Sequence, residues 1–204
     1  MGWRPFGSDG TLAAQFGKRV APINAYILAT EPLPTGLTKS LLPDNRTYIE
    51  ARRSPNYIRL STTRLLFGGQ TGHMSGAPQK VCAALVKQMT SLLPDLDGVR
   101  ISHFWHGVCA APRDLLPRVG VRNGIHFALG YCFSGNAMPP FLGEIAAKHI
   151  LGRSSPPSIF EESDLPYFPR LARPEQFISG LATVNGWMDT LFDVQINHTD
   201  RMVA

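Results

Sequence analysis

Apolar positions along the chain change their spacing several times, and each change predicts an element of secondary structure. Alternating apolar and polar residues, or short β-favouring runs, predict strands over 23–30, 47–51, 57–61, 64–67, 99–105 and 125–129. Apolar residues three or four positions apart predict helices over 78–93, 139–151 and 175–192. Turn residues dominate 107–120 and prolines recur over 153–174, so both segments are expected to be irregular.

The order of these elements predicts the fold class. Several short strands that follow one another closely, joined by turns, form an antiparallel meander, and the later strands alternate with helices. We therefore expect an α+β fold with a mixed, largely antiparallel sheet and packed helices.

Composition narrows the functional classes. The formal net charge is +5, but the basic residues are scattered, with no run longer than a pair such as Arg52-Arg53, so nucleic-acid binding is not expected. The three cysteines are far apart and form no CxxC pair, which indicates a cytoplasmic setting and no metal site. No apolar run reaches the roughly 18 residues of a membrane span, and no signal peptide is expected.

The stretch from Gly130 to Asn136 lies between a predicted strand and a predicted helix. A strand that breaks at glycine and leads into a helix can present free backbone N–H groups and the positive end of the helix dipole. Such a corner attracts an anion or a developing oxyanion. The alternative interpretation is an ordinary strand-to-helix turn that needs glycine for its geometry.

A second candidate for chemistry is the passage from Trp105 to Gly120. Arg113 or Arg118 could bind a carboxylate through the planar guanidinium, and the alternative is a solvated arginine on a loop. His103 and His106 flank the tryptophan, but neither is assigned as a general base.

Several motifs, in this order and spacing, resemble the C-terminal half of the D-amino-acid-oxidase-like family of FAD-dependent oxidoreductases. The resemblance covers about 180 residues and rests on Asn24-Ala25-Tyr26, Ala29 to Leu33, Arg64 to Gly69, Trp105-x-Gly107, Asp114-x-x-Pro117-x-x-Gly120, Gly130-Tyr131-Cys132, Ser134-Gly135, Leu142-Gly143-Glu144 and Phe160-Glu161-Glu162. It is nearest to bacterial members that oxidise glycine, D-amino acids or γ-glutamylputrescine-type amines.

The resemblance implies an enzyme that transfers a hydride from a C–H beside an amine to FAD, with a small amine or amino acid as substrate. It implies four parts: an irregular lead-in (1–19), a substrate-domain sheet and helix (20–104), the last part of the FAD-binding domain (105–152) and a strap with a helix (153–204). The implied cofactor-binding residues are Gly107, Asp114, Pro117, Gly120, Gly130, Tyr131, Ser134 and Gly135, and the implied substrate-binding residues are Tyr57, Arg59 and Phe67. No catalytic side chain is assigned.

The chain departs from the family pattern in ways that leave a second hypothesis open. The GxGxxG turn that would hold the FAD pyrophosphate is absent, so we expect this N-terminal FAD-binding segment to be missing and supplied in cis or in trans. Phe133 stands where the family usually has glycine, and Pro112 where it has threonine. The alternative is therefore a non-catalytic remnant or binding module that does not hold FAD alone.

Overall fold

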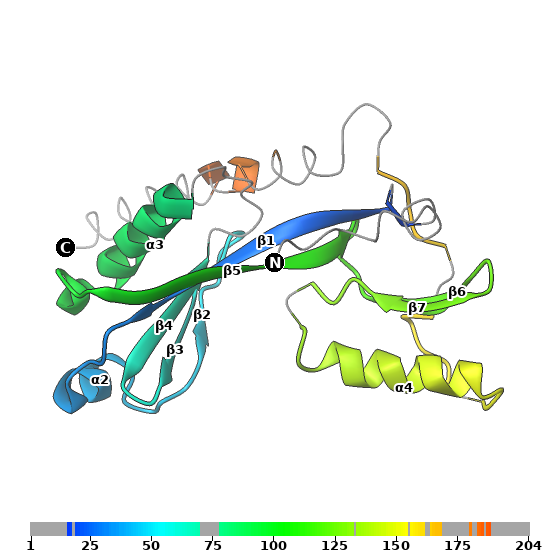
Figure 1. Ribbon diagram of the computed structural model, residues 1–204, viewed down its shortest axis with the longest axis horizontal. Helices are drawn as coiled ribbons and strands as arrows, with labels where there is room; N and C mark the ends of the chain where they lie inside the picture. The colour runs from blue at the N-terminus through cyan, green and yellow to red at the C-terminus, as the bar shows by residue number, and fades with distance from the viewer. Residues whose placement is uncertain are drawn as a thin grey trace, which may run out of the picture. The chain divides into compact units, whose positions relative to one another are not determined.

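The computed structural model describes residues 16–17, 19–69, 78–132, 134–154, 156–161, 164–168, 180, 183–185 and 187–188. Strands and helices are both present, in a largely antiparallel arrangement, which confirms the predicted α+β class (Figure 1). The chain divides into two compact units: one comprises 1–23 and 108–178, and the other 24–107 and 179–204. The predicted lead-in lies almost entirely outside the described residues, as does most of the predicted helix over 175–192.

The second unit is built on a five-stranded sheet. Its strands are β1 (Val20–Thr30), β2 (Tyr48–Ile49), β3 (Tyr57–Ser61), β4 (Arg64–Gly69) and β5 (Ile101–Pro112), in the order β2-β3-β4-β1-β5, and β1 and β5 also contribute residues to the first unit. Strand β1 pairs antiparallel with β4, and β3 pairs antiparallel with both of its neighbours, β2 and β4. The predicted meander is thus confirmed, with Tyr57–Ser61 at its predicted bounds.

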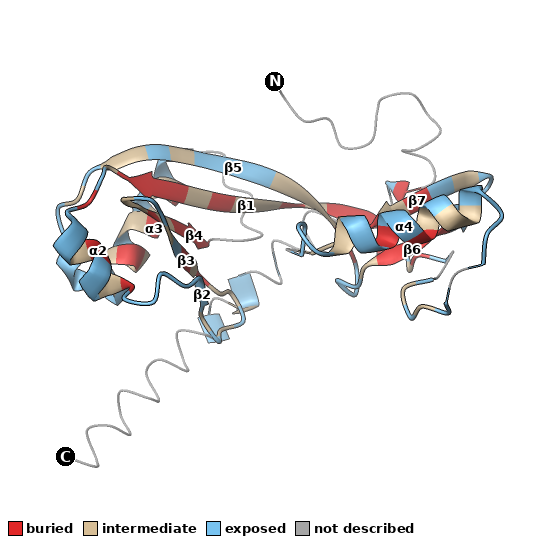
Figure 2. Ribbon diagram, turned by 90° about the horizontal axis from the view of Figure 1, so that it is seen from below, coloured by how far each residue is buried: buried red, intermediate tan, exposed pale blue. Residues whose placement is uncertain are grey.

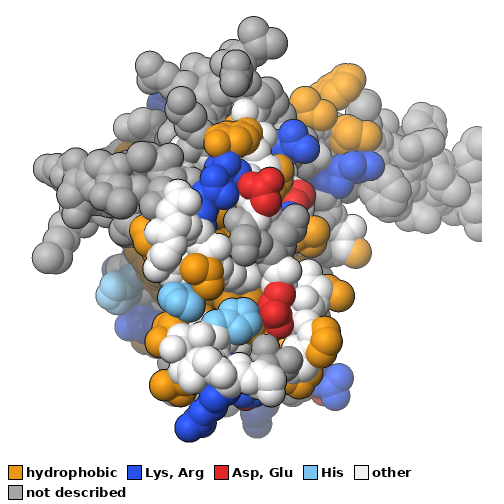
Figure 3. Space-filling view, turned by 90° about the vertical axis from the view of Figure 1, so that its right-hand side faces the viewer, with side chains coloured by type: hydrophobic (Ala, Val, Ile, Leu, Met, Phe, Trp, Pro, Cys, Tyr) orange, Lys and Arg blue, Asp and Glu red, His pale blue; other side chains and the backbone are white. Residues whose placement is uncertain are grey.

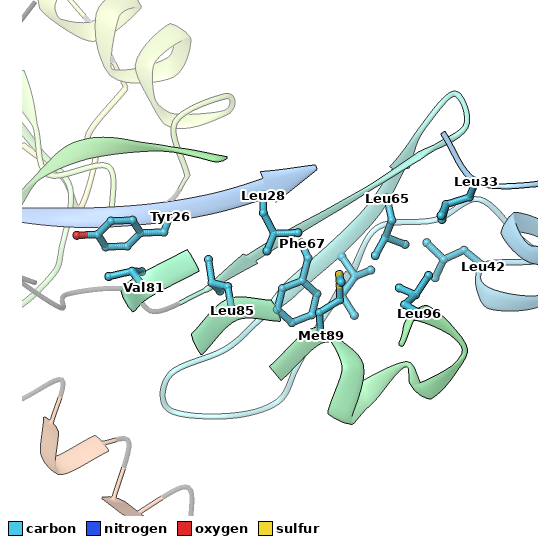
Figure 4. Close-up of a cluster of buried hydrophobic side chains, with 11 residues drawn as sticks. Tyr26, Leu28, Leu33, Leu42, Leu65, Phe67, Val81, Leu85, Met89 and Leu96 are labelled. Atoms are coloured by element: carbon cyan, nitrogen blue, oxygen red, sulfur yellow. The ribbon is translucent and has the colours of Figure 1, made fainter. Parts of the chain in front are cut away.

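The core of this unit lies between the sheet and helix α3 (Pro78–Leu92). Ile58, Leu65, Phe67 and Leu28 come from three adjacent strands, and their register places them on one face of the sheet (Figure 4). The helix adds its buried stripe of Val81, Leu85 and Met89, four residues apart, which the sequence pattern predicts. Burial of these side chains supplies the main stabilisation of the unit.

The sequence pattern does not predict two short helical elements of this unit. Helix α2 (Thr35–Leu41) follows Pro34, and η1 (Pro94–Leu96) follows α3. Helix α2 packs Leu37 and Leu41 against the core, but two leucines in a seven-residue helix are too few for its period to be recognised.

The first unit contains a β-hairpin of β6 (Arg118–Arg122) and β7 (Ile125–Leu129). Asn123 and Gly124 form its two-residue turn, both with positive φ, as the turn that matches strand twist requires. The expectation that 107–120 is irregular is wrong at both ends, because β5 continues to Pro112 and β6 begins at Arg118. Asn-Gly between two apolar runs was the sequence signal for this hairpin.

Helix α4 (Met138–Ile150) packs on the hairpin through Leu142 and Ile145, which lie with Val119 in one buried cluster. The segment after the helix returns to the same hairpin, where the Val119 N–H donates to the Phe160 carbonyl over 2.9 Å. Arg19 then fixes the following residues, since its guanidinium donates to the Asp164 carboxylate over 3.0 Å and to the Leu165 carbonyl. The described part of the predicted strap is therefore anchored rather than loose.

Candidate functional site

The strand-to-helix corner after β7 is shaped by Gly130. Its φ is +80°, a conformation that side chains other than glycine rarely adopt. A Cβ at this position would lie 2.7 Å from Pro112 Cγ and 2.9 Å from the Leu116 carbonyl oxygen. Gly130 therefore lets the corner close against the loop that follows β5, and it brings together the two segments that the sequence analysis singled out.

The loop itself is closed by an ion pair between Asp114 and Arg118. The two guanidinium nitrogens lie 2.8 and 2.5 Å from the two carboxylate oxygens, and the Leu116 N–H donates to the same carboxylate over 3.2 Å. The hydrogen bond from Arg118 holds the pKa of Asp114 below its ordinary value. Arg118 is buried and its fork is used on Asp114, so the proposal that Arg118 binds a substrate carboxylate is not supported by its geometry. Arg113 is exposed in the same loop.

Pro112 and Leu115 complete this loop. Pro112 is fully buried against Gly130, and its carbonyl accepts the Leu115 N–H over 3.0 Å. Leu115 has a φ of +60°, which is unfavourable for a leucine. Of the remaining predicted residues here, Gly120 is buried in β6 and Pro117 is half-buried just before that strand.

Tyr131 and Ser134 form the turn that leads into α4. The Tyr131 hydroxyl donates to the Ala128 carbonyl over 2.9 Å, and burial raises the pKa of this tyrosine. The Ser134 N–H donates to the Tyr131 carbonyl over 2.8 Å, while the Ser134 carbonyl accepts N–H groups from Ala137 and Met138. The hydrogen bonds of both residues therefore stabilise the turn. Phe133 lies outside the described residues.

The expected free N–H groups at the start of α4 are not found. Ala137 and Met138 donate to Ser134, and the next two residues are Pro139 and Pro140, which have no N–H. The prediction of helix amides that face an anion is therefore wrong for the helix itself, because prolines fill its first turn.

Two residues just before the helix, Gly135 and Asn136, offer N–H groups where the helix itself does not. Both are exposed, and their backbone N–H groups have no acceptor among the described residues. No heavy atom of the described residues lies within 4 Å of the position of a Cβ at Gly135. These two amides are the donors that this corner offers to an electron-rich group, which is the requirement at the edge of a flavin ring. Neither the sequence nor the described residues supply a glycine-rich cradle for the pyrophosphate of FAD.

Cys132 lies in the corner between Tyr131 and Ser134, and its φ is +37°. Burial raises its pKa to about 11, with further contributions from the charges of Cys109 and Asp114. A thiol with such a pKa stays protonated near neutral pH, so it packs as a small apolar group.

The other predicted residues lie in the second unit, which is described by itself. Tyr57 is half-buried, its ring covers Gly68, and its hydroxyl donates to the Tyr26 carbonyl over 3.1 Å. Arg59 is exposed on the same strand, two residues along, so it shares the face of Tyr57 that is opposite the core. Phe67 is fully buried in the core, so its side chain serves packing (Figure 4). Gly107 is exposed in β5.

The described residues show no feature specific to nucleic-acid, metal or membrane binding. On the face drawn in Figure 3, hydrophobic side chains lie among basic, acidic and histidine side chains, without the continuous basic surface that nucleic acid needs. The described residues include no group of three or more His, Cys, Asp or Glu side chains arranged for a metal ion. None of the helices within the described ranges is both long and apolar enough to cross a membrane.

Comparison with known proteins decides the family. The model of the family described as "FAD dependent oxidoreductase" matches residues 6–149. The chain belongs to this family of FAD-dependent oxidoreductases. The resemblance stated from the motifs is therefore confirmed.

Individual family members show how much of the fold this chain contains. It is 31% identical over 151 residues to the probable oxidoreductase OrdL of Haemophilus influenzae, covering 73% of this chain and 34% of that protein. It is 27% identical to the γ-glutamylputrescine oxidoreductase of Escherichia coli, covering 76% of this chain and 36% of that protein. The fold matches glycine oxidase from Geobacillus kaustophilus with a TM-score of 0.58 and 19% identity, over 79% of this chain and 43% of the other. The chain thus spans little more than a third of the curated relatives it matches.

Proposed function

We propose that this chain forms the part of an FAD-dependent oxidoreductase that faces the flavin ring and the substrate, a small amine or amino acid. Membership of the family supports the reaction type, and the names of two relatives indicate glycine and γ-glutamylputrescine as starting points. Both compounds carry a C–H bond next to an amine. When bound, FAD supplies the chemistry by accepting the hydride from that carbon.

The observation that carries the proposal is the corner from Gly130 to Asn136. Gly130 and the Pro112–Pro117 loop fix the corner, and the Gly135 and Asn136 N–H groups have no acceptor in the part of the chain that the structure describes. Donors fixed in advance stabilise negative charge without reorganising when it develops. In this proposal the two amides hold the electron-rich edge of the ring, and the Asp114–Arg118 pair keeps the loop beside them in shape.

The other residues that the family resemblance implies are proposed either to support this corner or to contact the substrate or the ring. Tyr131, Ser134, Pro117 and Gly120 hold the turn and hairpin in the geometry that presents the amides. Tyr57 and Arg59, on the face of the sheet opposite the core, are proposed to contact substrate, and Gly107 to lie near the ring. Phe67 is proposed to position this sheet through the core.

The nucleotide half of FAD needs residues that this sequence does not contain. We propose that a nucleotide-binding segment, in cis or in trans, completes the site, and the short coverage of the relatives supports this view. We also propose a cytoplasmic location, in keeping with three free cysteines.

The direct test co-expresses this chain with a nucleotide-binding segment, for which the portion of the H. influenzae relative that this chain does not match is a first choice. The purified complex is expected to be yellow, and anaerobic addition of glycine or γ-glutamylputrescine is expected to bleach the flavin absorbance near 450 nm. A matched complex with Gly135→Pro, which removes one of the two N–H groups at the second position of the Ser134–Ala137 turn, is expected to hold less flavin. A complex that assembles but stays colourless in excess FAD would refute the proposal.

The first turn of α4 favours one alternative. Pro139 and Pro140 remove two N–H groups from a position where an active flavin corner would gain from them. A non-catalytic remnant of the same fold would tolerate this loss. It would show the colourless outcome of the experiment above while remaining folded.

A further inference from the structure

Helix α4 is apolar on two opposite sides. Leu142 and Ile145 on one side are buried against the hairpin. With about 3.6 residues per turn, a second apolar set falls on the other side and is exposed, comprising Pro140, Gly143, Ala147, Ile150 and Leu151 (Figure 2). Leu151 continues the last turn, because its N–H donates to the Ala147 carbonyl over 3.0 Å. A helix that is apolar all round is normally a buried helix.

The exposed side of α4 leaves large apolar side chains in contact with solvent. Ile150 is 62% exposed and Leu151 is 63% exposed. The exposed side of α3, by contrast, carries polar and charged residues such as Gln79, Lys80 and Lys87. Water therefore suits the outer side of α3, whereas the outer side of α4 lacks a partner in the part of the chain that the structure describes.

The outer side of α4 also has the layout of an interface. Glu144 and Lys148, whose charged atoms lie 2.7 Å apart, form an ion pair that borders the apolar residues and does not interrupt them. An apolar centre with a polar rim is the usual composition of a protein–protein interface. Gly143 and Ala147, one turn apart, keep the centre low, so an element of a partner can pack close to the helix.

We propose that the outer apolar side of α4 is the surface on which the nucleotide-binding segment docks. The inference rests on the proposed function, since that function requires the segment. The matched stretch makes up only 34% of the H. influenzae relative, so such enzymes contain ample further chain to cover this side. Helix α4 also follows the candidate flavin corner directly, where the rest of FAD has to be held. A second copy of this chain suits the surface less well, because both copies carry a net charge of +5.

The test measures association with the segment independently of flavin. The unmatched portion of the H. influenzae relative is tagged and co-expressed with the chain, and the chain that co-purifies is quantified per segment. Ala147→Lys puts a cation in the apolar centre, so at least about tenfold less chain is expected to co-purify. Ala83→Lys is the matched control, because it makes the same change at an exposed alanine of α3, and it is expected to co-purify like the parent. Both variants are expected to keep the parent's midpoint in urea, since both alanines are exposed.

Chemical labelling gives a second measurement. Ala147→Cys is expected to react with a maleimide about tenfold more slowly in the complex than in the chain alone, because the centre of an interface excludes solvent. Ala83→Cys is expected to react equally in both. Slow labelling of Ala147→Cys in the chain alone would mean that another part of this chain covers the surface, and it would overturn the proposal.

Colour and association separate this inference from the proposed function. A colourless complex that Ala147→Lys disrupts would support the docking surface while refuting the flavin site. A yellow complex that Ala147→Lys leaves intact would overturn the docking surface alone. Absence of any co-purification of the parent chain would overturn the docking surface as well, as would self-association of the chain that Ala147→Lys abolishes.

Discussion

Substitution of Gly130 by alanine tests how the candidate corner is built. Two separate penalties follow from the structure. An alanine with φ near +80° costs about 1–2 kcal/mol relative to glycine. Its Cβ would also lie 2.7 Å from Pro112 Cγ and 2.9 Å from the Leu116 carbonyl oxygen. Relief of such overpacking moves the backbone and costs about 1–3 kcal/mol more.

Two other glycines separate these penalties. Gly124 has a φ of +77° with nothing within 4 Å of its Cβ position, so Gly124→Ala carries only the conformational penalty of about 1–2 kcal/mol. Gly135 has neither a positive φ nor a close neighbour, so Gly135→Ala is expected to change the free energy of unfolding by less than about 0.5 kcal/mol.

The assay is urea unfolding of the three variants and the parent chain, followed by far-ultraviolet circular dichroism. The expected order of destabilisation is Gly130→Ala, at about 2–5 kcal/mol, then Gly124→Ala, then Gly135→Ala. A Gly130→Ala variant no less stable than Gly124→Ala would mean that the corner is not packed against Pro112 and Leu116, and the site would lose its physical basis.

Three further predictions concern the loop and corner. Glycine adopts the φ of +60° at position 115 without the penalty that leucine has there, so Leu115→Gly is expected to raise the free energy of unfolding in urea by about 1 kcal/mol. An unchanged or lower stability would show that this backbone is not strained. Asp114→Asn breaks the pair with Arg118 and is expected to lower the free energy of unfolding by about 1–3 kcal/mol at pH 7. Because the pKa of Asp114 is lowered in the folded chain, the parent is expected to be more stable than the variant above the unfolded pKa near 4, and to lose this difference as pH falls through the lower folded pKa. A stability difference that persists at pH 2 would contradict this. With a pKa of about 11, Cys132 is thiolate in only about one molecule in a thousand at pH 8. Iodoacetamide is therefore expected to modify Cys132 more slowly than Cys82 in the folded chain, and both at the same rate in urea, as followed by peptide mass spectrometry. Equal rates in the folded chain would show that Cys132 is not buried.

The sequence predicted those elements whose pattern is local. Strands 57–61 and 125–129 and helix 78–92 emerge at or within a residue of their predicted bounds, because alternation and four-residue spacing persist over the whole element. Helix α2 was missed because it has only seven residues, and its two core-facing leucines, Leu37 and Leu41, are too few to define a period. The continuation of β5 through Gly107 to Pro112 was missed because it depends on pairing within the sheet with β1, far away in sequence, and not on local preference.

The candidate site shows the same limit. The sequence placed the corner after Gly130 and the loop around Asp114 in one region by resemblance, and the structure brings Gly130 against Pro112 and Leu116. The use of Arg118 on Asp114 depends on a four-residue loop geometry that composition does not reveal. The missing helix amides, by contrast, were visible as Pro139-Pro140 in the sequence.

Central to this account is that the Gly135 and Asn136 amides bind the edge of a flavin ring. The most direct measurement is a titration of the ¹⁵N-labelled chain with FMN, which carries the ring without the adenosine half and is soluble enough to reveal weak binding by nuclear magnetic resonance. The largest amide shifts are expected at residues 130–136 and 112–117, and they are expected to shrink in Gly135→Pro, which lacks one of the two N–H groups. Shifts confined to other segments, or none at millimolar FMN, would contradict the account.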